Sequence, residues 1–389
     1  MLRVRWKIAA ETSMHPISTS SEFPVVIIGG GVIGLSIGWE LVRAQRPVVI
    51  LERGEAGRGA SWMAAGMLAA DAEIGFEEID LYRLSRESLA RWPEFAARLE
   101  ADSGFSVDYR TEGTLMVADD RDSAARLRRH FEFQRQQGLS VEWLTGAEAL
   151  DIEPFLAPRL AAAVLSRSDH QVDNRRLVQA LRTAFLNKGG VLLERTPVQA
   201  IHSDASRPAV VTQEGERIEG SCVIVAAGAW SALIEGLVAS ARPPVRPVKG
   251  QMIELAIEAP FELKHVVRGP QAYLAPKSDG RMLVGATMEE MGFDARVTAG
   301  GLYKILEGAW EVVPGIYDLP VTDTWAGFRP GSRDNAPLLG PSGAPGVLFA
   351  TGHYRHGILL TPVTAEEMAR LVLGQETSPL LAPFSPRRF

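Results

Sequence analysis

The sequence contains very little cysteine: one residue, Cys222, in a chain of 389. A single thiol cannot form a disulfide within the chain, which excludes the small secreted folds that disulfide bridges hold together. Cys222 stands in the apolar run 222–225, where we expect it to pack as a small buried hydrophobic residue. We therefore expect a reducing compartment, the cytoplasm.

The chain also lacks a long hydrophobic run and a strong excess of either charge. No stretch reaches the about 18 consecutive apolar residues that a membrane-spanning helix needs, so we expect no membrane span. The net charge is -6, from 41 Lys and Arg against 47 Asp and Glu. A mildly acidic chain is poorly suited to a phosphate backbone, so nucleic acid is not an expected partner.

What the chain does have is length and an ordinary globular composition. It is 46% hydrophobic and 23% charged, and 37 Gly with 24 Pro is too little bias for a fibrous or disordered protein. A chain of 389 residues is too long for one ordinary domain. We expect two domains, or one domain interleaved with a second.

A glycine-rich motif follows the first strand-like run. Residues 25–28 are all apolar and β-branched, which predicts a strand buried on both faces. Gly29, Gly31 and Gly34 follow as G-x-G-x-x-G at the start of a helical pattern; this spacing allows a tight turn, close approach of a pyrophosphate and close helix–strand packing. Glu52, at the end of the next strand-like run, can accept hydrogen bonds from ribose hydroxyls. The segment predicts a dinucleotide site, for FAD or NAD rather than NADP.

Three further glycine-containing segments come after Glu52, at 59–68, 225–230 and 350–353. Small residues let the backbone approach a ligand, and Ser61 offers a hydroxyl to a phosphate. Four such approaches fit FAD better than the smaller NAD. The alternative is that these three segments are ordinary turns at strand ends.

Six segments that span nearly the whole chain after residue 23 carry a family resemblance. They are 25–34, 64–68, 247–250, 284–289, 325–331 and 352–360. In them the sequence resembles the flavin amine and amino-acid oxidases of the D-amino-acid oxidase superfamily, most closely the bacterial glycine oxidases of thiazole biosynthesis. The family suggests a homotetramer.

The resemblance implies an α/β fold, in which an FAD-binding Rossmann-like domain is interleaved with a mainly antiparallel β substrate domain. The ligand site would lie at the interface of the two domains. The expected limits are 22–105, 147–245 and 325–375 for the FAD-binding domain, 106–146 and 246–324 for the substrate-binding domain, 1–21 for a disordered extension and 376–389 for a C-terminal tail.

The resemblance also implies which residues hold the cofactor. FAD would be bound non-covalently, because the 334–337 region lacks the cysteine that tethers flavin in related sarcosine oxidases. Val198 would meet the adenine, and the backbone of 353–359 would lie against the flavin ring, where N–H groups stabilise negative charge. Beyond the three glycines of the motif, the expected cofactor-binding residues are Val32, Ile33, Glu52, Arg53, Ala60, Ser61, Ala65, Gly66, Met67, Val198, Gly228, Gly352, His353, Tyr354, Arg355, His356, Gly357, Ile358 and Leu359.

The implied reaction is oxidation of an amine to an imine with hydride transfer to flavin, followed by hydrogen peroxide formation from O2 and hydrolysis of the imine to a 2-oxo acid and ammonia. It needs no metal. Arg329 would clamp the substrate carboxylate through two parallel hydrogen bonds, and Tyr273 would donate another. Arg355 and Met288 would lie near the substrate. Structural roles are the alternative for these four residues, and we assign no catalytic acid or base; His356 is expected to face solvent.

One departure from the family leaves the preferred substrate open. Glycine oxidases can carry a histidine two residues before the tyrosine, where this chain has Gln271. Glycine, sarcosine, D-alanine and D-proline are all candidates. Two other functions compete with an oxidase: a D-amino-acid dehydrogenase that passes electrons to a quinone or another acceptor, and a flavoprotein-fold binding module without activity. Retention of all four glycine segments with Arg329 and Tyr273 argues against the module.

Overall fold

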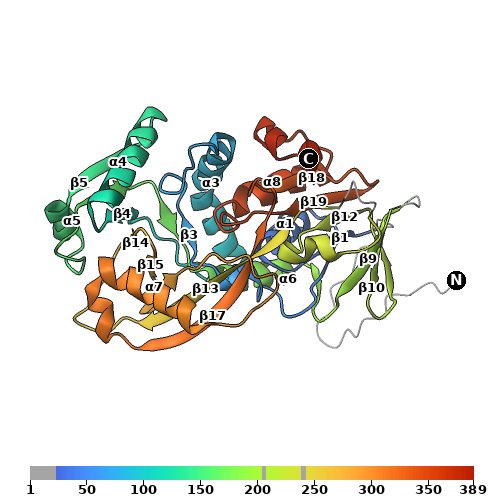
Figure 1. Ribbon diagram of the computed structural model, residues 1–389. Coiled ribbons are helices and arrows are strands. Elements are labelled where there is room, and N and C mark those ends of the chain that lie inside the picture. Colours follow the sequence, from blue (N-terminus) through green and yellow to red (C-terminus); the bar gives the residue numbers. More distant parts are fainter. Residues whose placement is uncertain (1–22, 204–206, 238–241) are drawn as a thin grey trace.

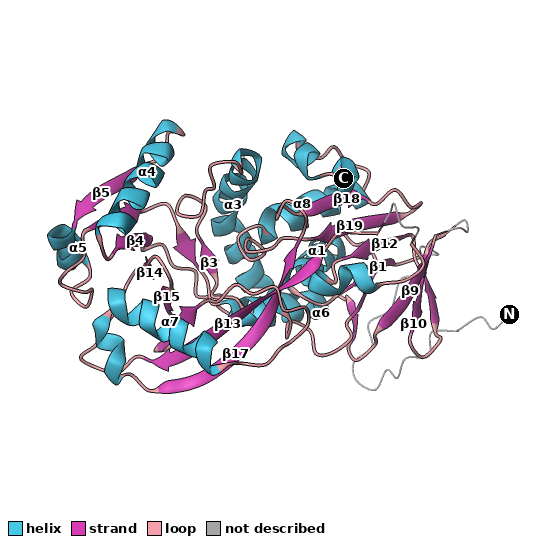
Figure 2. Cartoon of the chain, in the orientation of Figure 1, coloured by secondary structure: helices cyan, strands magenta, loops and turns pink. Residues whose placement is uncertain are grey.

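A computed structural model of the chain describes residues 23–203, 207–237 and 242–389 (Figure 1). The predicted disordered extension at 1–21 lies outside this range. Two large sheets organise the described chain, with helices packed on both (Figure 2). Each sheet has its own hydrophobic core.

The first sheet has six strands in the order β18-β19-β12-β1-β2-β8, all parallel except the edge strand β18. β1 and β2 are buried along their whole length, as their continuous apolar sequences predict. We expected Cys222 to be fully buried, but it is only half-buried because it is the first residue of β12. The strands are β1 Val25–Ile28, β2 Val48–Leu51, β8 Val191–Leu193, β12 Cys222–Val225, β18 Leu338–Pro341 and β19 Val347–Thr351.

Helices cover one face of this sheet and a small antiparallel sheet covers the other. The helices bury Trp39, Trp92, Phe95 and Phe185 in a core with the sheet. They are α1 Val32–Arg43, α3 Ile79–Ser103, α6 Asn174–Asn187 and α8 Thr361–Val372. On the opposite face lie β9 Val198–His202, β10 Ala209–Thr212 and β11 Arg217–Glu219. This layering is the predicted α/β, Rossmann-like arrangement, and the fold class is confirmed.

The second sheet has eight strands in the order β17-β13-β16-β15-β14-β4-β6-β5, antiparallel except where β14 meets β4. α5 Gly146–Ile152 and α7 Ala299–Val312 pack on one face, and α4 Arg121–Gln136 on the other. The strands are β4 Thr114–Ala118, β5 Val141–Thr145, β6 Ala162–Ser166, β13 Arg246–Ala256, β14 Val266–Arg268, β15 Tyr273–Pro276, β16 Arg281–Gly285 and β17 Val321–Gly331.

The position of β6 differs from the limit expected from the sequence. The sequence assigned residues from 147 onward to the FAD-binding domain. In the structure β6 is a strand of the eight-stranded sheet, and α5 packs against β5 and β6 of that sheet. β6 is a short, mainly apolar run that is buried throughout between β4 and β5. Such a run has no alternation that would show which sheet it joins.

Shorter elements connect the two sheets and close the C-terminal end. They are α2 Ala60–Met63, β3 Met67–Leu68, β7 His170–Gln171 and the 3-10 helices η1 Gly228–Leu233, η3 Pro314–Asp318, η4 Pro379–Phe384 and η5 Pro386–Arg388. The expected C-terminal tail is folded onto the protein, since Phe384 is buried in the core of the helices. Arg388 also forms an ion pair with Asp334 at 2.7 Å.

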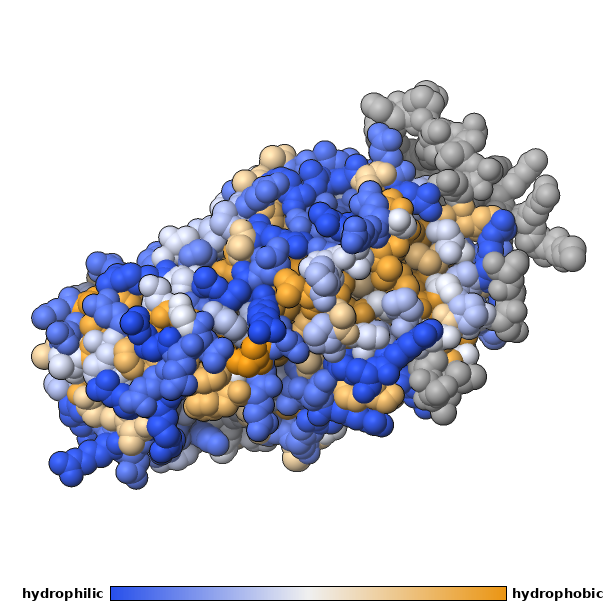
Figure 3. Space-filling view, turned by 90° about the horizontal axis from the view of Figure 1, so that it is seen from above, coloured by the Kyte–Doolittle hydropathy of each residue, from blue (hydrophilic) through white to orange (hydrophobic). Residues whose placement is uncertain are grey.

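The face of the molecule seen from above is mainly polar. Seen from above, apolar side chains reach the surface near the middle of the molecule and hydrophilic side chains cover most of the rest of that face (Figure 3). In the part of the chain that the structure describes, no helix has both the length and the apolarity to cross a membrane.

Candidate active site

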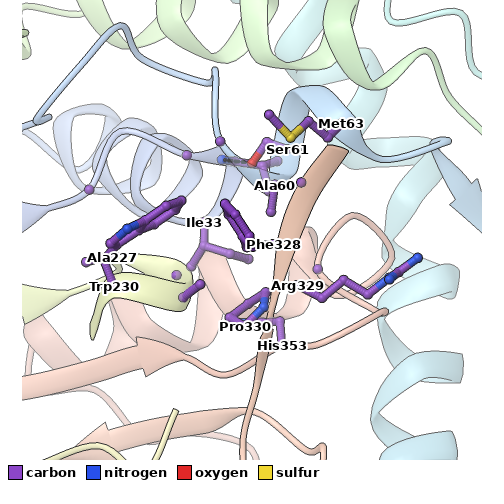
Figure 4. Close-up of a pocket in the computed structure, with 18 of the residues that line it drawn as sticks. Ile33, Ala60, Ser61, Met63, Ala227, Trp230, Phe328, Arg329, Pro330 and His353 are labelled. Carbon is purple, nitrogen blue, oxygen red and sulfur yellow. Dashed lines mark hydrogen bonds between the residues drawn. The ribbon is translucent and has the colours of Figure 1, made fainter. Parts of the chain in front are cut away.

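A cavity of about 1000 Å³ lies between the two sheets. One part of its wall is formed at the carboxyl ends of β1, β2, β12 and β19, and the other by β13, β15 and β17. The carboxyl ends of parallel strands are the usual place for a ligand in an open α/β sheet. Figure 4 shows side chains from both parts of the wall, among them Ile33, Trp230, Phe328 and Arg329.

The three glycines of the motif have separate structural roles. A Cβ at Gly29 would lie 2.4 Å from Ala226 O, and a Cβ at Gly34 would lie 2.0 Å from Gly29 O, so both are needed for close backbone packing. Gly31 faces the cavity, where the nearest atom to a Cβ would be Ser61 Oγ at 3.3 Å. A side chain at Gly31 would therefore occupy ligand space.

The N-terminus of α1 opens into the same space. Val32 N donates to Ser61 Oγ at 2.9 Å, so the Ser61 oxygen accepts a hydrogen bond from the first turn of α1. The Ser61 hydroxyl can still donate its own proton to a ligand. Helix N-termini favour negative charge because their first N–H groups and the helix dipole point the same way. The N-terminus of α1 is therefore suited to a phosphate.

Glu52 and Arg53 stand at the end of β2 on the cavity wall. The Glu52 carboxylate accepts hydrogen bonds from Gly30 N at 2.8 Å and Gly54 N at 2.9 Å, which fix its orientation. The Arg53 guanidinium lies 3.5 Å above the Trp230 ring. Both residues are thus held in place for contact with a ribose or phosphate.

Arg329 lies toward the other end of the cavity, on β17. Neighbouring residues of a strand point to opposite sides, and Figure 4 shows Phe328 turned toward Trp230 while Arg329 extends the other way. Arg329 Nη1 donates to Thr287 O at 3.1 Å. A Cβ at Gly250 would lie 2.4 Å from Nη1, so the guanidinium occupies space that only a glycine leaves free.

Tyr273 is the neighbour of Arg329 on the wall. Its hydroxyl lies 3.1 Å from Met252 Sδ, and a Cβ at Gly285 would lie 2.5 Å from the hydroxyl oxygen. Burial raises the pKa of Tyr273, although Arg329 opposes that rise. Tyr273 therefore keeps its proton and is a hydrogen-bond donor. One end of the cavity, at the N-terminus of α1, is thus suited to a nucleotide, and the other end, at Arg329 and Tyr273, is suited to a carboxylate.

Comparison with known proteins gives the family. The family model described as FAD dependent oxidoreductase (DAO) matches residues 24–371, which is most of the chain. The chain belongs to this family of FAD-dependent oxidoreductases. The enzyme class and the cofactor predicted from the sequence are confirmed.

Relatives within the family include glycine oxidases, as the resemblance predicted. Glycine oxidase from Geobacillus kaustophilus is 39% identical over 368 residues, covering 94% of this chain and 97% of the relative. Its crystal structure matches 95% of this chain and 99% of that chain at a TM-score of 0.89 and 38% identity.

Two further relatives carry other names. The bifunctional protein ThiO/ThiG of Synechocystis sp. is 37% identical over 94% of this chain, which spans 54% of that longer protein. The crystal structure of iminodiacetate oxidase from Chelativorans sp. BNC1 covers 93% of this chain and 98% of that chain at a TM-score of 0.84 and 28% identity.

The cavity of this FAD-dependent oxidoreductase fits its cofactor. Its volume is at the upper end for small-molecule sites, which suits a dinucleotide together with a small substrate. Val198, Gly228 and the loop 353–359 line the wall, as expected from the sequence. Of the expected cofactor residues, Gly34 and Gly352 are not part of the wall. Gly34 packs against the strand, and Gly352 takes a left-handed conformation with φ of +75°.

Two expected substrate residues lie elsewhere. Met288 is 64% exposed and lies outside the cavity wall, where its sulfur is 3.0 Å from the Tyr354 hydroxyl. Gln271 also lies outside the wall and packs against α7, where a Cβ at Gly308 would be 2.7 Å from Gln271 Cβ. Neither residue lies on the cavity wall, so their contact with substrate stays a prediction.

The wall contains a charged residue that sequence reasoning missed, Glu73. Burial alone would raise its pKa, but the ion pair with Arg268 and the nearby His356 and Arg355 lower the pKa to about 2. Glu73 is therefore ionised near pH 7, and its low pKa makes it a weak proton acceptor. The sequence offered no more indication of this role than a glutamate shortly after the 64–68 segment.

The two histidines of the loop are both buried. His353 Nε2 lies 3.1 Å from Thr364 Oγ1, and burial lowers the pKa of His353 to about 3. His356 was expected to face solvent, but its side chain is only 7% exposed, and burial lowers its pKa to about 4. The turn after β19 carries it back into the protein. Both side chains are neutral near pH 7.

A buried lysine connects the two parts of the wall. Lys277 Nζ donates to Ala65 O at 2.7 Å and to Val172 O at 2.9 Å. Ala65 lies on the cofactor side of the cavity, whereas Lys277 follows β15 of the larger sheet. Burial lowers the pKa of Lys277 to about 8. This ammonium group helps to fix the 64–68 segment.

Asp169 gives a testable pH dependence. Its carboxylate accepts hydrogen bonds from Asp71 N and Ala72 N, which hold the segment that leads to Glu73. Burial, followed by the Asp71 charge, raises the pKa of Asp169 from 3.8 to about 7. Folding therefore favours the protonated form, and this contribution to stability is complete below pH 3.8 and lost as the pH rises through about 7.

Asp169→Asn should therefore flatten the decline of the free energy of unfolding between pH 4 and 7, an interval set by the Asp169 pKa values. The measurement is urea unfolding of wild type and variant across that interval. Other titrating groups cancel in the difference between the two proteins. Parallel pH curves would contradict the role of Asp169.

Proposed function

We propose that this enzyme oxidises glycine and other small amino acids and amines, including sarcosine, D-alanine and D-proline, with O2 as the acceptor. The observation that carries the proposal is the pair Arg329 and Tyr273, which share one cavity with a dinucleotide cradle. The names of the glycine oxidase relatives support the substrate. The iminodiacetate oxidase supports the inclusion of N-substituted glycines.

Arg329 and Tyr273 bind and orient the substrate in this proposal. Nη1 of Arg329 is anchored on backbone carbonyls, so the rest of its planar fork meets the substrate carboxylate through parallel hydrogen bonds. The Tyr273 hydroxyl donates to the same carboxylate. Holding the carboxylate fixes the Cα–H bond relative to the cofactor, and this orientation supplies much of the rate enhancement.

FAD, when bound, supplies hydride acceptance and reaction with O2. With glycine, the balance is glycine, O2 and water in, and glyoxylate, ammonia and hydrogen peroxide out. The amine must lose its proton before oxidation, and Glu73, whose pKa is about 2, is a weak proton acceptor for that step. The proposal therefore has the substrate react in its deprotonated form. The imine of glycine is also a precursor for thiazole synthesis, and the ThiO/ThiG relatives support a role there.

The test is O2 uptake and peroxide release by the purified yellow protein across glycine, sarcosine, D-alanine, D-proline and the L counterparts of the chiral ones. We expect peroxide from glycine or sarcosine. Bleaching of the flavin without O2 uptake, together with turnover when a quinone is added, would favour a D-amino-acid dehydrogenase instead. If no amino acid bleaches the flavin, the proposal fails. The homotetramer expected from the resemblance stays a prediction.

A further inference from the structure

Lys277 is a buried ammonium group to which the proposed reaction assigns no role. The residue is 3% exposed. In addition to Ala65 O and Val172 O, its Nζ donates a hydrogen bond to Gln171 Oε1 at 3.2 Å. A charged lysine has three N–H donors and no acceptor, so these three acceptors match the ammonium form and use all of its donors.

The peptide group between Ala65 and Gly66 connects Lys277 to the cavity. Its carbonyl oxygen is the Ala65 O that Nζ holds at 2.7 Å, and in a trans peptide the N–H points the opposite way. Gly66 is buried and lines the cavity, and within the described residues Gly66 N has no hydrogen-bond partner. Buried backbone N–H groups are rarely left unpaired, so Gly66 N is a donor kept for a ligand.

Neighbouring contacts fix the direction of this peptide. Gly66 has a φ of +77°, and its carbonyl oxygen accepts a hydrogen bond from Val172 N at 2.9 Å. A Cβ at Gly66 would lie 2.0 Å from Val172 O, so only glycine fits. Ala65 O has no donor other than Lys277 in the described part of the chain. Lys277 is therefore the one side chain that holds the Ala65 carbonyl.

The Ala65–Gly66 peptide lies at the end of the cavity that is suited to the substrate. Ala65 packs in one hydrophobic cluster with Met252 and Tyr273. Tyr273 begins the strand β15, which Lys277 directly follows. The part of FAD that reacts must lie next to the substrate, so the part of the cofactor nearest to Gly66 is the flavin ring.

Lys277 carries its charge without a close counterion. None of the carboxylates in the described chain lies within ion-pair distance of Nζ, and the nearby Asp173 pairs with Arg281. Burial lowers the pKa of Lys277 to about 8. Of the charged groups around it, Arg110 and Arg281 add to this effect, and Asp173 and Asp108 oppose it. The ammonium form therefore prevails near neutral pH, one peptide group away from the cavity.

We propose that Lys277 is a positioning residue for the flavin: its ammonium group holds and polarises the Ala65–Gly66 peptide, so that Gly66 N donates a hydrogen bond to the flavin ring. A donor that is polarised by a neighbouring charge in a low-dielectric interior forms a stronger hydrogen bond. Reduction adds negative charge to the flavin, so this donor and the charge behind it favour the reduced form. The inference rests on the FAD cofactor and not on which amino acid is oxidised.

Lys277→Met tests this role, because methionine keeps the length of the side chain but carries neither charge nor donor. The reduction potential of the bound flavin, measured without substrate against a dye of known potential, should lie below that of wild type near neutral pH. We expect the reduced flavin to be about tenfold less favoured relative to the oxidised form, which is about 30 mV for a two-electron couple. Lys277→Arg, which keeps the charge, should restore most of the wild-type value.

Lys249→Met is the matched control. Lys249 is also a buried lysine of the eight-stranded sheet, but its Nζ pairs with Glu289 at 3.7 Å instead of binding the 64–68 segment. This variant should keep the wild-type potential. An unchanged potential in Lys277→Met, or an equal drop in Lys249→Met, would overturn the inference.

A pH series separates the charge from a merely structural role. The charge is complete below the Lys277 pKa of about 8 and is lost as the pH rises through it. The gap in potential between wild type and Lys277→Met should therefore narrow well above that pH, whereas a gap between wild type and Lys277→Arg should open. If Lys277→Met does not retain FAD, the arginine variant still decides the question. A constant difference between Lys277→Arg and wild type across this pH range would overturn the inference.

Discussion

Arg329→Ala is expected to keep its yellow FAD and to lose about 100-fold in kcat/KM for glycine or sarcosine. The loss corresponds to about 3 kcal/mol of charge-assisted hydrogen bonding between the guanidinium and the substrate carboxylate. The flavin stays bound because the dinucleotide contacts lie toward the other end of the cavity. Steady-state kinetics with flavin absorbance checks both parts of the prediction.

Arg329→Lys serves as the control, since it keeps the positive charge but replaces the planar fork by a single point of contact. It should fall between wild type and alanine. A steric variant, Gly250→Ala, should weaken the same step, because its Cβ would meet Arg329 Nη1 at 2.4 Å. Unchanged kinetics in Arg329→Ala would remove Arg329 from the substrate site.

Gly31→Val is expected to abolish FAD binding. The valine side chain would extend into the cavity at the N-terminus of α1, the space suited to a pyrophosphate. The variant should purify without yellow colour and show no flavin absorbance after incubation with FAD. The protein itself should fold, because no backbone atom blocks a Cβ at this position.

Gly300→Val provides the comparison for that variant. Gly300 lies in α7, and a Cβ there would meet no atom within 4 Å. This variant should bind FAD as wild type does, so loss of colour in Gly31→Val alone would locate the effect in the cavity. A yellow Gly31→Val protein would show that the second glycine of the motif does not border the cofactor.

Local signals explain why the nucleotide-binding half was predictable. Residues 25–28 form a continuous apolar run, and burial on both faces of a parallel sheet produces that pattern directly. Gly29 and Gly34 are required by backbone atoms on the adjacent strand or a few residues away, whereas Gly31 borders the cavity. By contrast, β6 is also mainly apolar but joins the other sheet, and only its pairing with β4 and β5 reveals that.

The candidate site was predictable only where a motif surrounds the residue. Arg329 and Tyr273 stand in segments that resemble a family, and both lie on the wall. Glu73, Arg268 and His356 meet through tertiary contacts between separate parts of the chain, which no local pattern encodes. The exposed position of Met288 was not predictable, because a methionine near a strand end looks the same in sequence whether it faces a cavity or solvent.

The long ladder between β13 and β17 has a mechanical consequence. Their pairing runs without a break in chain from Ala326, opposite Gln251, to Gly331, opposite Arg246, and Arg329 sits within it. Both strands belong to the eight-stranded sheet, so a displacement of this sheet relative to the six-stranded one would move the paired strands, and Arg329 with them, as one unit. Tyr273 on β15 belongs to the same sheet, so the two residues expected to bind the carboxylate would keep their positions relative to each other.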